Sequence, residues 1–465
     1  MLNKHNNIVA MFYNRVQETT SLRRALSRKR KQFIVLYGRR RCGKSTLLRK
    51  VSGKGDVYFL SSQANQNLQR EALANLLEDK SPGISSASFN DWDSFFSFLN
   101  KATRERFVLI LDEFPYLVQS APELPSIINR YIDNRDTLNF DIVVCGSSQQ
   151  MMRGLVLSAT APLYGRADEI MKIEPLSAGW LLEHLPKNAP EELVKEFAVW
   201  GGIPRYWELR AEYASLAEAV RELVLLPTGI MREEPKRLLL DDMREVTQSI
   251  SLLTVVALGA HRLSEIAARM RRPATDLSRP LNRLIELGYI NKETPYGSLA
   301  HRNKTSLYKV ADPFIHFYFN LIYPNLSTLV PGHIESSWQR ITLKMNQFVS
   351  LEWERLCRKA IGLHPMLLSY GFVAGRWWGN GRDGRAMELD IVGTSPDNKF
   401  LLVGECKWTQ VKNPESLIVR LLAKAQQLPI YNGQEIIPVL TAKEFIKTPS
   451  CIHLSPADTL KLLKL

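Results

Sequence analysis

The chain has 465 residues, 45% of them hydrophobic and 9% aromatic, which excludes both a disordered chain and a single small module. Its 61 Lys and Arg against 47 Asp and Glu give a formal net charge of +14, which favours a polyanion such as DNA as a partner over a cationic ligand. The five cysteines form no Cys-x-x-Cys pair and no apolar run is long enough for a bilayer, so we expect a cytoplasmic protein without a membrane partner.

Residues 10–178 alternate short apolar runs with amphipathic stretches. Continuous apolar runs of this kind are typical of strands that are buried on both faces of a parallel sheet. The pattern therefore predicts an α/β domain with a parallel sheet. The predicted strands are Gln32–Tyr37, Asp56–Ser61, Arg106–Leu111, Asp141–Cys145 and Glu169–Ile173.

The segment after the first predicted strand matches the P-loop pattern G-x-x-x-x-G-K-[ST] and leads into a predicted helix. In such a loop, backbone N–H groups surround the phosphates of ATP, the lysine neutralises the outer phosphates, and the serine holds Mg²⁺. We therefore expect Ser45 to be a ligand of Mg²⁺. The predicted ATP-binding residues here are Gly38, Arg39, Arg40, Arg41, Cys42, Gly43, Lys44, Ser45 and Thr46.

Two acids, Asp112 and Glu113, follow the apolar strand that starts at Phe107. In this position the first acid reaches Mg²⁺ and the second orients and deprotonates the attacking water. Ser147, after the next strand, is predicted to contact the γ-phosphate of ATP or that water, with helix capping as the alternative role.

Residues 179–243 have a helical pattern that is interrupted by the turn Gly201–Pro204, and we expect a helical lid. Residues 244–312 then show three helical segments and a hairpin, which is the order of a winged helix. Within residues 261–310, ten Lys and Arg stand against four acids, a footprint typical of DNA phosphate contact. The alternative is a winged helix that contacts protein. The predicted DNA-binding residues are Arg271, Arg272, Arg279 and Arg283.

A hairpin near the C-terminus places acids on two neighbouring strands. If its turn centres on Pro396–Asp397, Asp390 faces Val403, and strand alternation then puts Asp390, Glu405 and Lys407 on one side. Carboxylates are suitable ligands for Mg²⁺ or Mn²⁺, and the lysine can position water against a phosphodiester. The pattern therefore predicts a metal site with Asp390 and Glu405 as ligands and Lys407 as a catalytic residue.

Several motifs together make the chain resemble the prokaryotic AAA+/STAND-type ATPases first noticed in archaea. They are Phe12-Tyr13-Asn14-Arg15, the P-loop, Leu111-Asp112-Glu113-Phe114-Pro115-Tyr116, Cys145-Gly146-Ser147-Ser148, Leu163-Tyr164-Gly165-Arg166 and Gly201-Gly202-Ile203-Pro204. The resemblance implies ATP-driven switching or assembly. It also implies an arginine-finger role for Arg166, and with it a homo-oligomer, and a place for Pro204 near the nucleotide base.

The C-terminal region resembles the PD-(D/E)xK fold of restriction endonucleases and the C-terminal domain of uncharacterised function that accompanies this ATPase family. The resemblance implies that Glu354, on the preceding helix, joins the metal ligands. The chain departs from the pattern because no proline precedes Asp390, and because Ser350 and Trp353 replace commoner residues. The matching blocks are Tyr308–Phe314, Phe348–Glu354, Gly375–Trp378 and Gly404–Trp408.

The sequence thus predicts an α/β protein: a P-loop NTPase parallel sheet over residues 10–178, a helical lid over 179–243, a winged-helix domain over 244–312 and a mixed α/β restriction-endonuclease-like domain over 313–465. We expect it to hydrolyse Mg-ATP, to bind DNA and to cleave it. Two alternatives stay open: an ATP-dependent regulatory switch that cuts nothing, and a scaffold with an inactive C-terminal site.

Overall fold

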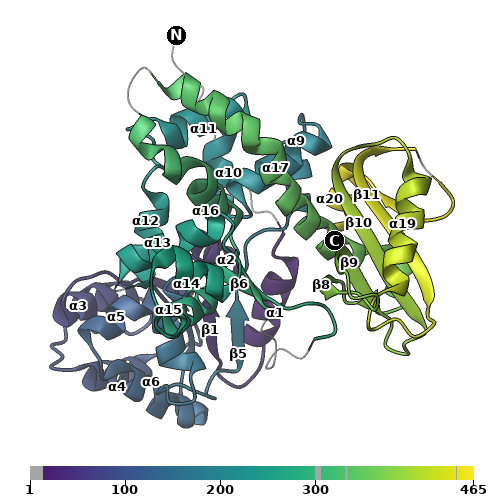
Figure 1. Cartoon of the computed structure of the whole chain (residues 1–465). Helices are drawn as coiled ribbons and strands as arrows, with labels where there is room; N and C mark the ends of the chain where they lie inside the picture. Colours follow the sequence, from purple (N-terminus) through teal and green to yellow (C-terminus); the bar gives the residue numbers. More distant parts are fainter. Residues whose placement is uncertain (1–13, 244, 299–304, 330–332, 447, 465) are drawn as a thin grey trace. The chain divides into compact units, whose positions relative to one another are not determined.

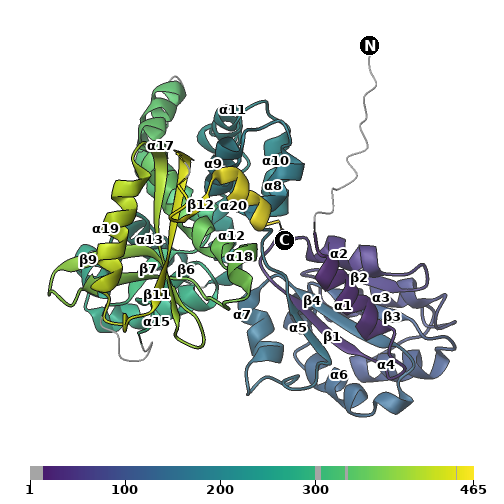
Figure 2. The same cartoon turned by 90° about the vertical axis from the view of Figure 1, so that its right-hand side faces the viewer.

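A computed structural model describes residues 14–243, 245–298, 305–329, 333–446 and 448–464. The chain forms two compact units, Met1–Pro175 and Leu176–Leu465, which are coloured from purple to yellow in Figure 1 and shown from a second side in Figure 2. The four domain ranges given by the sequence stay predictions.

The first unit is built on a five-stranded sheet whose strand order is β2-β3-β4-β1-β5 and whose strands are all parallel. The five predicted strands are all present, and the predicted α/β fold with a parallel sheet is confirmed. The strands are β1 (Phe33–Tyr37), β2 (Val57–Leu60), β3 (Val108–Asp112), β4 (Asp141–Gly146) and β5 (Glu169–Lys172).

Helices cover both faces of this sheet. Figure 2 shows α1 and α2 beside each other on one side of it, and α6 on the other. The helices of the first unit are α1 (Val16–Leu26), α2 (Lys44–Val51), α3 (Gln66–Leu77), α4 (Trp92–Ala102), α5 (Phe114–Ser120), α6 (Leu124–Asp133) and α7 (Gln149–Met152). The layered arrangement explains why the strands are apolar on both faces.

Alternate residues of the central strands form the main core of the first unit. Phe33 and Val35 belong to one buried cluster with Trp92, Phe95 and residues of α3 to α6. Their neighbours Ile34 and Leu36 are also fully buried, so they face the opposite side of the sheet. The carboxyl ends of the strands are thereby held rigidly, and the loops that follow them start from fixed points.

The second unit begins with short helices in the range predicted as a lid. Its α9 contacts α16, α17 and α20, so these helices pack into the rest of the unit. A buried ion pair between Arg210 and Glu196 holds α10 against α9, with N–O distances of 2.6 to 2.9 Å. The elements are α8 (Leu181–His184), α9 (Pro190–Trp200), α10 (Pro204–Ala211), α11 (Leu216–Val220) and α12 (Glu234–Asp242).

Three helices and a two-stranded antiparallel hairpin follow. In α15, Leu277, Leu281 and Leu284 recur at helical spacing and are fully buried, which leaves the polar face of the helix outside. The elements are α13 (Val246–Ala257), α14 (Leu263–Met270), α15 (Ala274–Glu286), β6 (Ile290–Glu293) and β7 (Leu307–Val310). Residues 299–304, between the two strands, lie outside the described residues.

The C-terminal part contains a mixed sheet of strand order β12-β11-β10-β9-β8. β9 is antiparallel to both β8 and β10. β10, β11 and β12 run parallel to one another. Figure 1 shows the long helix α17 and the shorter α19 on opposite sides of this sheet, and both contact β10. The elements are α16 (Pro313–Phe317), α17 (Ile334–Ile361), α18 (Pro365–Leu368), β8 (Gly375–Asn380), β9 (Ala386–Thr394), β10 (Phe400–Val411), α19 (Pro414–Gln426), β11 (Glu435–Phe445), β12 (Ile452–Leu454) and α20 (Pro456–Leu462).

The predicted register of the β9–β10 hairpin is wrong by two residues. Val403 pairs with Val392 instead of Asp390, because the turn includes Asn398 in a left-handed conformation with φ of 57° and is longer than assumed. A shift of two residues keeps the paired residues 391–394 and 401–404 on their predicted faces, since the side-chain period of a strand is two. The pair of Gly404 and Ile391 ends the ladder directly before Glu405, so Glu405 comes next to Asp390.

Among the described residues, no helix has both the length and the apolar character that crossing a membrane requires.

Candidate functional site

The phosphate-binding segment lies between β1 and α2. Gly38 has a φ of 150°, and a Cβ at this position would come within 2.4 Å of the Ile173 carbonyl oxygen, so only glycine allows this close approach. Arg41 and Gly43 also have left-handed φ values, of 67° and 87°. These conformations turn the loop back so that α2 starts at Lys44. The predicted Thr46 is exposed in the first turn of that helix.

Lys44 is buried at the centre of this loop. Its Nζ donates hydrogen bonds to the carbonyl oxygens of Gly38, at 2.8 Å, and Arg39, at 2.9 Å. Two carbonyl oxygens thus stabilise an ammonium group that would otherwise be costly to bury. The lysine is therefore held in the loop that the phosphates of ATP would enter.

Asp112 ends β3 and is buried beside the loop. Its Oδ2 accepts a hydrogen bond from Ser45 Oγ at 2.6 Å and another from the hydroxyl of Tyr58, and its Oδ1 accepts from the N–H of Glu113 at 2.9 Å. Burial, and then this contact with Asp112, raise the pKa of Tyr58 to about 12, so it remains a donor. The structure thus brings together the two residues that were predicted to hold Mg²⁺.

Glu113 is held in a left-handed conformation, with φ of 52°, between the end of β3 and the start of α5. Pro115 in the first turn of α5 fixes the direction of the helix. The Glu113 carboxylate accepts hydrogen bonds from Ser147 Oγ at 2.8 and 2.9 Å and from the Ser147 N–H at 3.2 Å. The predicted base and the predicted serine are therefore direct partners.

Arg15 is a site residue for which no specific role was predicted. Its guanidinium donates to the carbonyl oxygens of Cys42, at 3.0 Å, and Glu174, at 2.6 Å, and pairs with Glu18 at 2.8 Å. The side chain is buried, and it joins the phosphate-binding loop to the end of the first unit.

The family resemblance implied site roles for two further residues, Arg166 and Pro204. Arg166 precedes β5 and forms an ion pair with Asp133 at 3.0 Å, with 45% of its side chain exposed. Its side chain is therefore at the surface of the first unit. Pro204 is the first residue of α10 in the second unit, and the predicted contact with a nucleotide base stays a prediction.

The predicted DNA-binding arginines lie at the end of α14 and on α15. Arg271 and Arg272 follow α14, where Arg271 has a left-handed φ of 51°, and both are exposed. Arg279 is exposed on α15, while Arg283 is partly buried and lies 3.7 Å from Glu286. The leucine face of α15 points inward, so the arginines are on its outer face.

The acids of the C-terminal sheet are near one another but are paired with cations. Glu405 Oε1 lies 2.7 Å from Lys407 Nζ, and its Oε2 lies 3.6 Å from Lys424 Nζ on α19. Asp390 Oδ2 accepts a hydrogen bond from the Cys406 N–H at 2.8 Å. The predicted proximity of Asp390, Glu405 and Lys407 is thus present in the structure.

Glu354 lies on the other side of β10. Its helix α17 packs on the face of β10 that carries Cys406 and Trp408, and Trp353 contacts Trp408 at a ring distance of 5.4 Å. By strand alternation, Glu405 is on the opposite face, which α19 covers. Arg358 also lies between the acids, 3.9 Å from Glu354 and 3.0 Å from the Asp390 carbonyl oxygen.

This arrangement shifts the pKa values of the groups involved. Burial, followed by the charge of Asp390, raises the pKa of Glu354 to about 7. Burial also raises the pKa of Asp390, and the charges of Glu405 and Glu388 add to the effect. Burial lowers the pKa of Lys407, but the ion pair with Glu405 outweighs it, so the pKa is raised overall. In the part of the chain that the structure describes, no three His, Cys, Asp or Glu side chains converge to hold one metal ion.

Sequence reasoning missed three residues at these two sites, Tyr58, Arg358 and Lys424, and it included Arg15 in a family motif without assigning its role. The roles of the three missed residues depend on which strands and helices are neighbours, and no local motif marks them. Tyr58 contacts Asp112 only because β2 pairs with β3, and the sequence alone does not give that order.

The comparisons with known proteins agree with this site. Residues 12–208 match a family described as an ATPase domain predominantly from Archaea. Residues 318–418 match a second family, described as archaeal and bacterial proteins of unknown function. An uncharacterized protein of Methanocaldococcus jannaschii is 32% identical over 409 residues, which cover 87% of this chain and 89% of that protein.

The chain therefore belongs to the archaeal-type ATPase family, and the predicted resemblance is confirmed. It is a nucleotide-binding ATPase with the C-terminal domain that accompanies this family. Among solved structures, a Walker-type ATPase of Pyrococcus abyssi is 21% identical, with a TM-score of 0.48 over 66% of this chain and 96% of that one. The ORC2 protein of Aeropyrum pernix is 15% identical, with a TM-score of 0.40 over 71% of this chain and 96% of that one.

Proposed function

We propose that this ATPase uses Mg-ATP to control the binding of DNA by residues 244–312 and its metal-dependent cleavage by residues 313–465. One observation supports the proposal that the first unit binds and hydrolyses Mg-ATP. Hydrogen bonds connect Ser45 to Asp112, Asp112 to Glu113 and Glu113 to Ser147 beside the phosphate-binding loop. A hydroxyl and a carboxylate 2.6 Å apart are the two protein ligands that Mg²⁺ needs beside ATP. Mg²⁺ would supply charge neutralisation for the phosphates.

Each residue of the first unit then has a stated task. Lys44 binds the outer phosphates of ATP, Ser45 and Asp112 hold the metal, and Glu113 takes a proton from the attacking water. Ser147 keeps the Glu113 carboxylate in place through its hydroxyl and its N–H. An exposed Arg166 is free to be contributed to a neighbouring subunit in place of its pairing with Asp133, and we propose a homo-oligomer for this reason.

DNA binding is supported by the charge and the position of the arginines. The outer face of α15 carries Arg279 and Arg283, and the residues before it, Arg271 and Arg272, are exposed. Three helices followed by an antiparallel hairpin are the parts of a winged helix, which places one helix in the major groove. Phosphate contacts by these arginines would position the DNA.

The C-terminal acids fit a divalent metal through two ligands. Asp390 and Glu405 are neighbours across β9 and β10, and Mg²⁺ is commonly held by one or two carboxylates together with water. The metal would supply a Lewis acid for the phosphodiester. Lys407, 2.7 Å from Glu405, would position the attacking water, and Glu354 would act from the far side through Asp390.

A second candidate function is an ATP-dependent switch that binds DNA or protein and cuts nothing. One observation favours it: the charges of Glu354 and Glu405 are already balanced by Arg358, Lys407 and Lys424. Acids that are neutralised in this way have less need of a metal ion.

One experiment separates the two candidates. Full-length protein is incubated with supercoiled plasmid DNA and Mg²⁺ or Mn²⁺, with and without ATP, and strand breaks are followed on a gel. We expect cleavage by the parent and by Asp383→Asn, which alters an exposed acid in the loop between β8 and β9, and none by Asp390→Asn. DNA binding without breaks in the parent would favour the switch. Breaks that persist in Asp390→Asn would remove this site from cleavage.

A further inference from the structure

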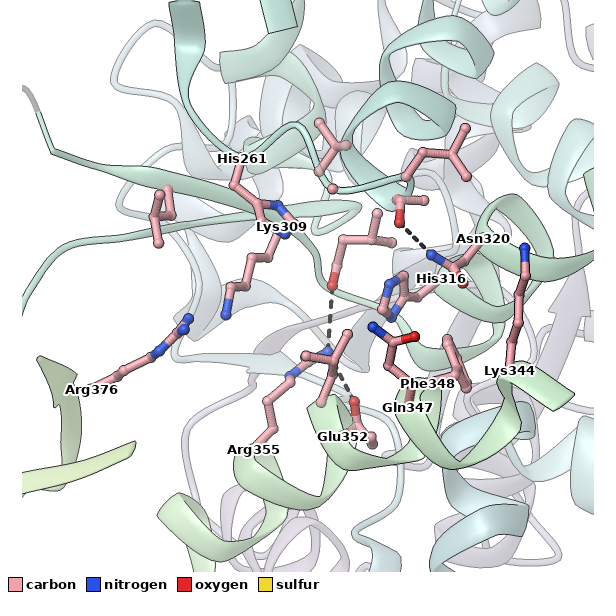
Figure 3. Close-up of a pocket in the computed structure, with 17 residues that line it drawn as sticks. His261, Lys309, His316, Asn320, Lys344, Gln347, Phe348, Glu352, Arg355 and Arg376 are labelled. Atoms are coloured by element: carbon pink, nitrogen blue, oxygen red, sulfur yellow. Dashed lines mark hydrogen bonds and ion pairs between the residues drawn. The ribbon is translucent and has the colours of Figure 1, made fainter. Parts of the chain in front are cut away.

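A cavity of about 460 Å³ with a mixed polar and apolar lining lies in the second unit. Asp390, Glu405 and Glu354 do not line it, although the charge of Glu354 acts on Lys309 and Arg376. Figure 3 shows that its lining comes from the end of α13, from β7, α16 and α17, and from Arg376 on β8. These segments belong to two ranges that the sequence predicts as separate domains. A cavity of this size can hold a ligand as large as a mononucleotide.

Positive charge dominates the lining of this cavity. Among the described residues, four cations line it, Lys309, Lys344, Arg355 and Arg376, against the single carboxylate of Glu352. That carboxylate lies 3.1 Å from Arg355, so their charges offset each other. The described part of the chain shows no ion pair for Lys344, which is exposed at one end.

The other two cations pair with acids that lie outside the cavity lining. Lys309 and Arg376 share one acid, Glu293, at distances of 3.4 and 4.0 Å, and Arg376 also pairs with Glu388. Neither acid lines this cavity. Figure 3 shows Lys309 and Arg376 at the same end of it, pointing toward each other.

Two imidazoles also line the cavity. Burial, followed by the charge of Arg355, lowers the pKa of His316 to about 3, and burial also lowers the pKa of His261, with Lys309 contributing. The His316 ring packs on Phe348 at a centroid distance of 4.9 Å, and within the described residues neither of its ring nitrogens makes a hydrogen bond. His261 Nδ1 lies 3.0 Å from the Tyr308 carbonyl oxygen. His316 therefore offers the cavity a polar edge that is not otherwise used.

The rest of the lining is apolar or neutral. Val256, Leu258, Phe348 and Leu351 provide an apolar wall, and Gln347 adds an amide beside His316. A ligand that matches all of these features has a strongly negative group for the lysines and an apolar or ring portion for the wall. An inorganic ion alone would leave the wall uncovered.

We propose that this cavity binds a small phosphate-bearing ligand of about mononucleotide size, at a site separate from the ATP site of the first unit. The phosphate would lie between Lys309 and Arg376, and the remainder of the ligand would lie against Phe348 and reach toward Lys344. The cavity would give the second unit a small-molecule input of its own, which ATP does not supply. This proposal does not depend on DNA cleavage.

Calorimetric titrations of the full-length chain test it, with Lys44→Ala present throughout to remove nucleotide binding at the P-loop. AMP and pyrophosphate are the two probes. We expect AMP to bind with a dissociation constant of about 1 mM or tighter, and pyrophosphate to bind more weakly. Equal affinities would show that phosphate alone is recognised and would overturn the part of the proposal that concerns the apolar wall.

Three further substitutions locate the bound probe. Lys309→Gln and Lys344→Gln should each weaken AMP binding, by about tenfold for the buried lysine and about threefold for the exposed one. Lys292→Gln is the matched control because Lys292 is exposed on β6 and does not line the cavity. If Lys309→Gln does not fold, as judged by its thermal unfolding, Lys344→Gln decides alone.

Two results would overturn the proposal. One is the absence of heat from either probe at about 5 mM, since a built phosphate site of this charge should be occupied at that concentration. The other is binding that is unchanged by both cavity substitutions, or weakened equally by Lys292→Gln, because the probe would then be held by charge elsewhere on the chain.

Discussion

The two acid pairs of this protein, Asp112 with Glu113 at the end of β3 and Asp390 with Glu405 on β9 and β10, have different partners. Hydroxyl and N–H groups from Ser45, Tyr58 and Ser147 surround the first pair. Two lysine ammonium groups and one N–H surround the second pair. The difference lies in the charge of the partners.

Neutral partners leave a carboxylate with its full negative charge, so a cation that arrives there exchanges one hydrogen bond for a stronger ionic contact. Charged partners already offset that negative charge, and a metal must compete with them. The first site is therefore poised to receive Mg²⁺ with ATP, whereas the second has an internal competitor for metal.

The largest effect should come from Glu113→Gln, which keeps the shape of the side chain and removes its basicity. We expect turnover of ATP to fall by about 100- to 10,000-fold, while ATP affinity changes little. Phosphate release and equilibrium nucleotide binding measure the two quantities. Glu105→Gln, an exposed acid ahead of β3, is the control. Turnover equal to that of the parent would show that Glu113 is not the base that activates water.

The two units should also differ in how their stability depends on pH. Within the described residues the first unit has no histidine, whereas the second holds His316 with a pKa of about 3. Its unfolded pKa of about 6.5 lies above the folded value, so its stabilising effect is present above pH 6.5 and is lost as the pH falls toward 3.

Between pH 7 and pH 5 the second unit should therefore lose about 2 kcal/mol of unfolding free energy through this residue. Urea unfolding at the two pH values, followed by fluorescence, measures it. His316→Gln should remove this residue's share, so the pH dependence of the variant should differ from that of the parent by about 2 kcal/mol. His333→Gln, an exposed histidine ahead of α17, should behave like the parent. The same loss in His316→Gln as in the parent would assign the pH dependence to other groups.

Salt should distinguish the two kinds of phosphate recognition that we propose. The P-loop would hold phosphate with a buried lysine and N–H groups, whereas exposed arginines would hold DNA, so DNA affinity should fall steeply with salt. Replacing both Arg279 and Arg283 with glutamine should lower the salt slope by about 2 and the affinity by about tenfold.

The control for this double substitution is Arg23→Gln with Arg24→Gln, two exposed arginines on α1. Fluorescence anisotropy of a labelled duplex over a range of salt concentrations gives both values. If the two double variants behave alike, α15 is not the DNA-contacting helix.

The smallest effect is expected from Lys424, whose charge competes with a metal ion for Glu405. Lys424 lies 3.6 Å from Glu405 and is partly exposed, so removing its charge should strengthen Mn²⁺ binding at the C-terminal acids by about two- to fivefold. Titration of Lys424→Gln with Mn²⁺ in the absence of nucleotide measures this, with Lys412→Gln as the exposed control. Weaker binding in Lys424→Gln would mean that the lysine supports the site.

Much of the first unit could be predicted from the sequence because its signals are local. Five apolar runs gave the five strands, and the P-loop pattern gave the loop before α2. The partners of Asp112 could not be predicted, because Tyr58 reaches it through the order of the strands. In the hairpin of β9 and β10 the predicted register was wrong, but an even shift preserves the faces of the paired residues, and Glu405 still follows the last pair beside Asp390.

The position of Glu354 was harder to predict. Its place on a helix before the hairpin was correct, but a motif does not say on which face of the sheet that helix packs. The contact of Trp353 with Trp408 decides it, and such contacts between distant segments leave no local trace in a sequence.

Arg15 links two separate backbone segments inside the first unit. One rigid guanidinium spans from the Cys42 carbonyl oxygen in the phosphate-binding loop to the Glu174 carbonyl oxygen, one residue before the first unit ends. A loop that moves when phosphates enter it must therefore either move the Glu174 backbone with it or break one of the two hydrogen bonds that Arg15 donates. A change at the phosphate-binding loop can thus be passed through Arg15 to the backbone at Glu174, where the first unit ends.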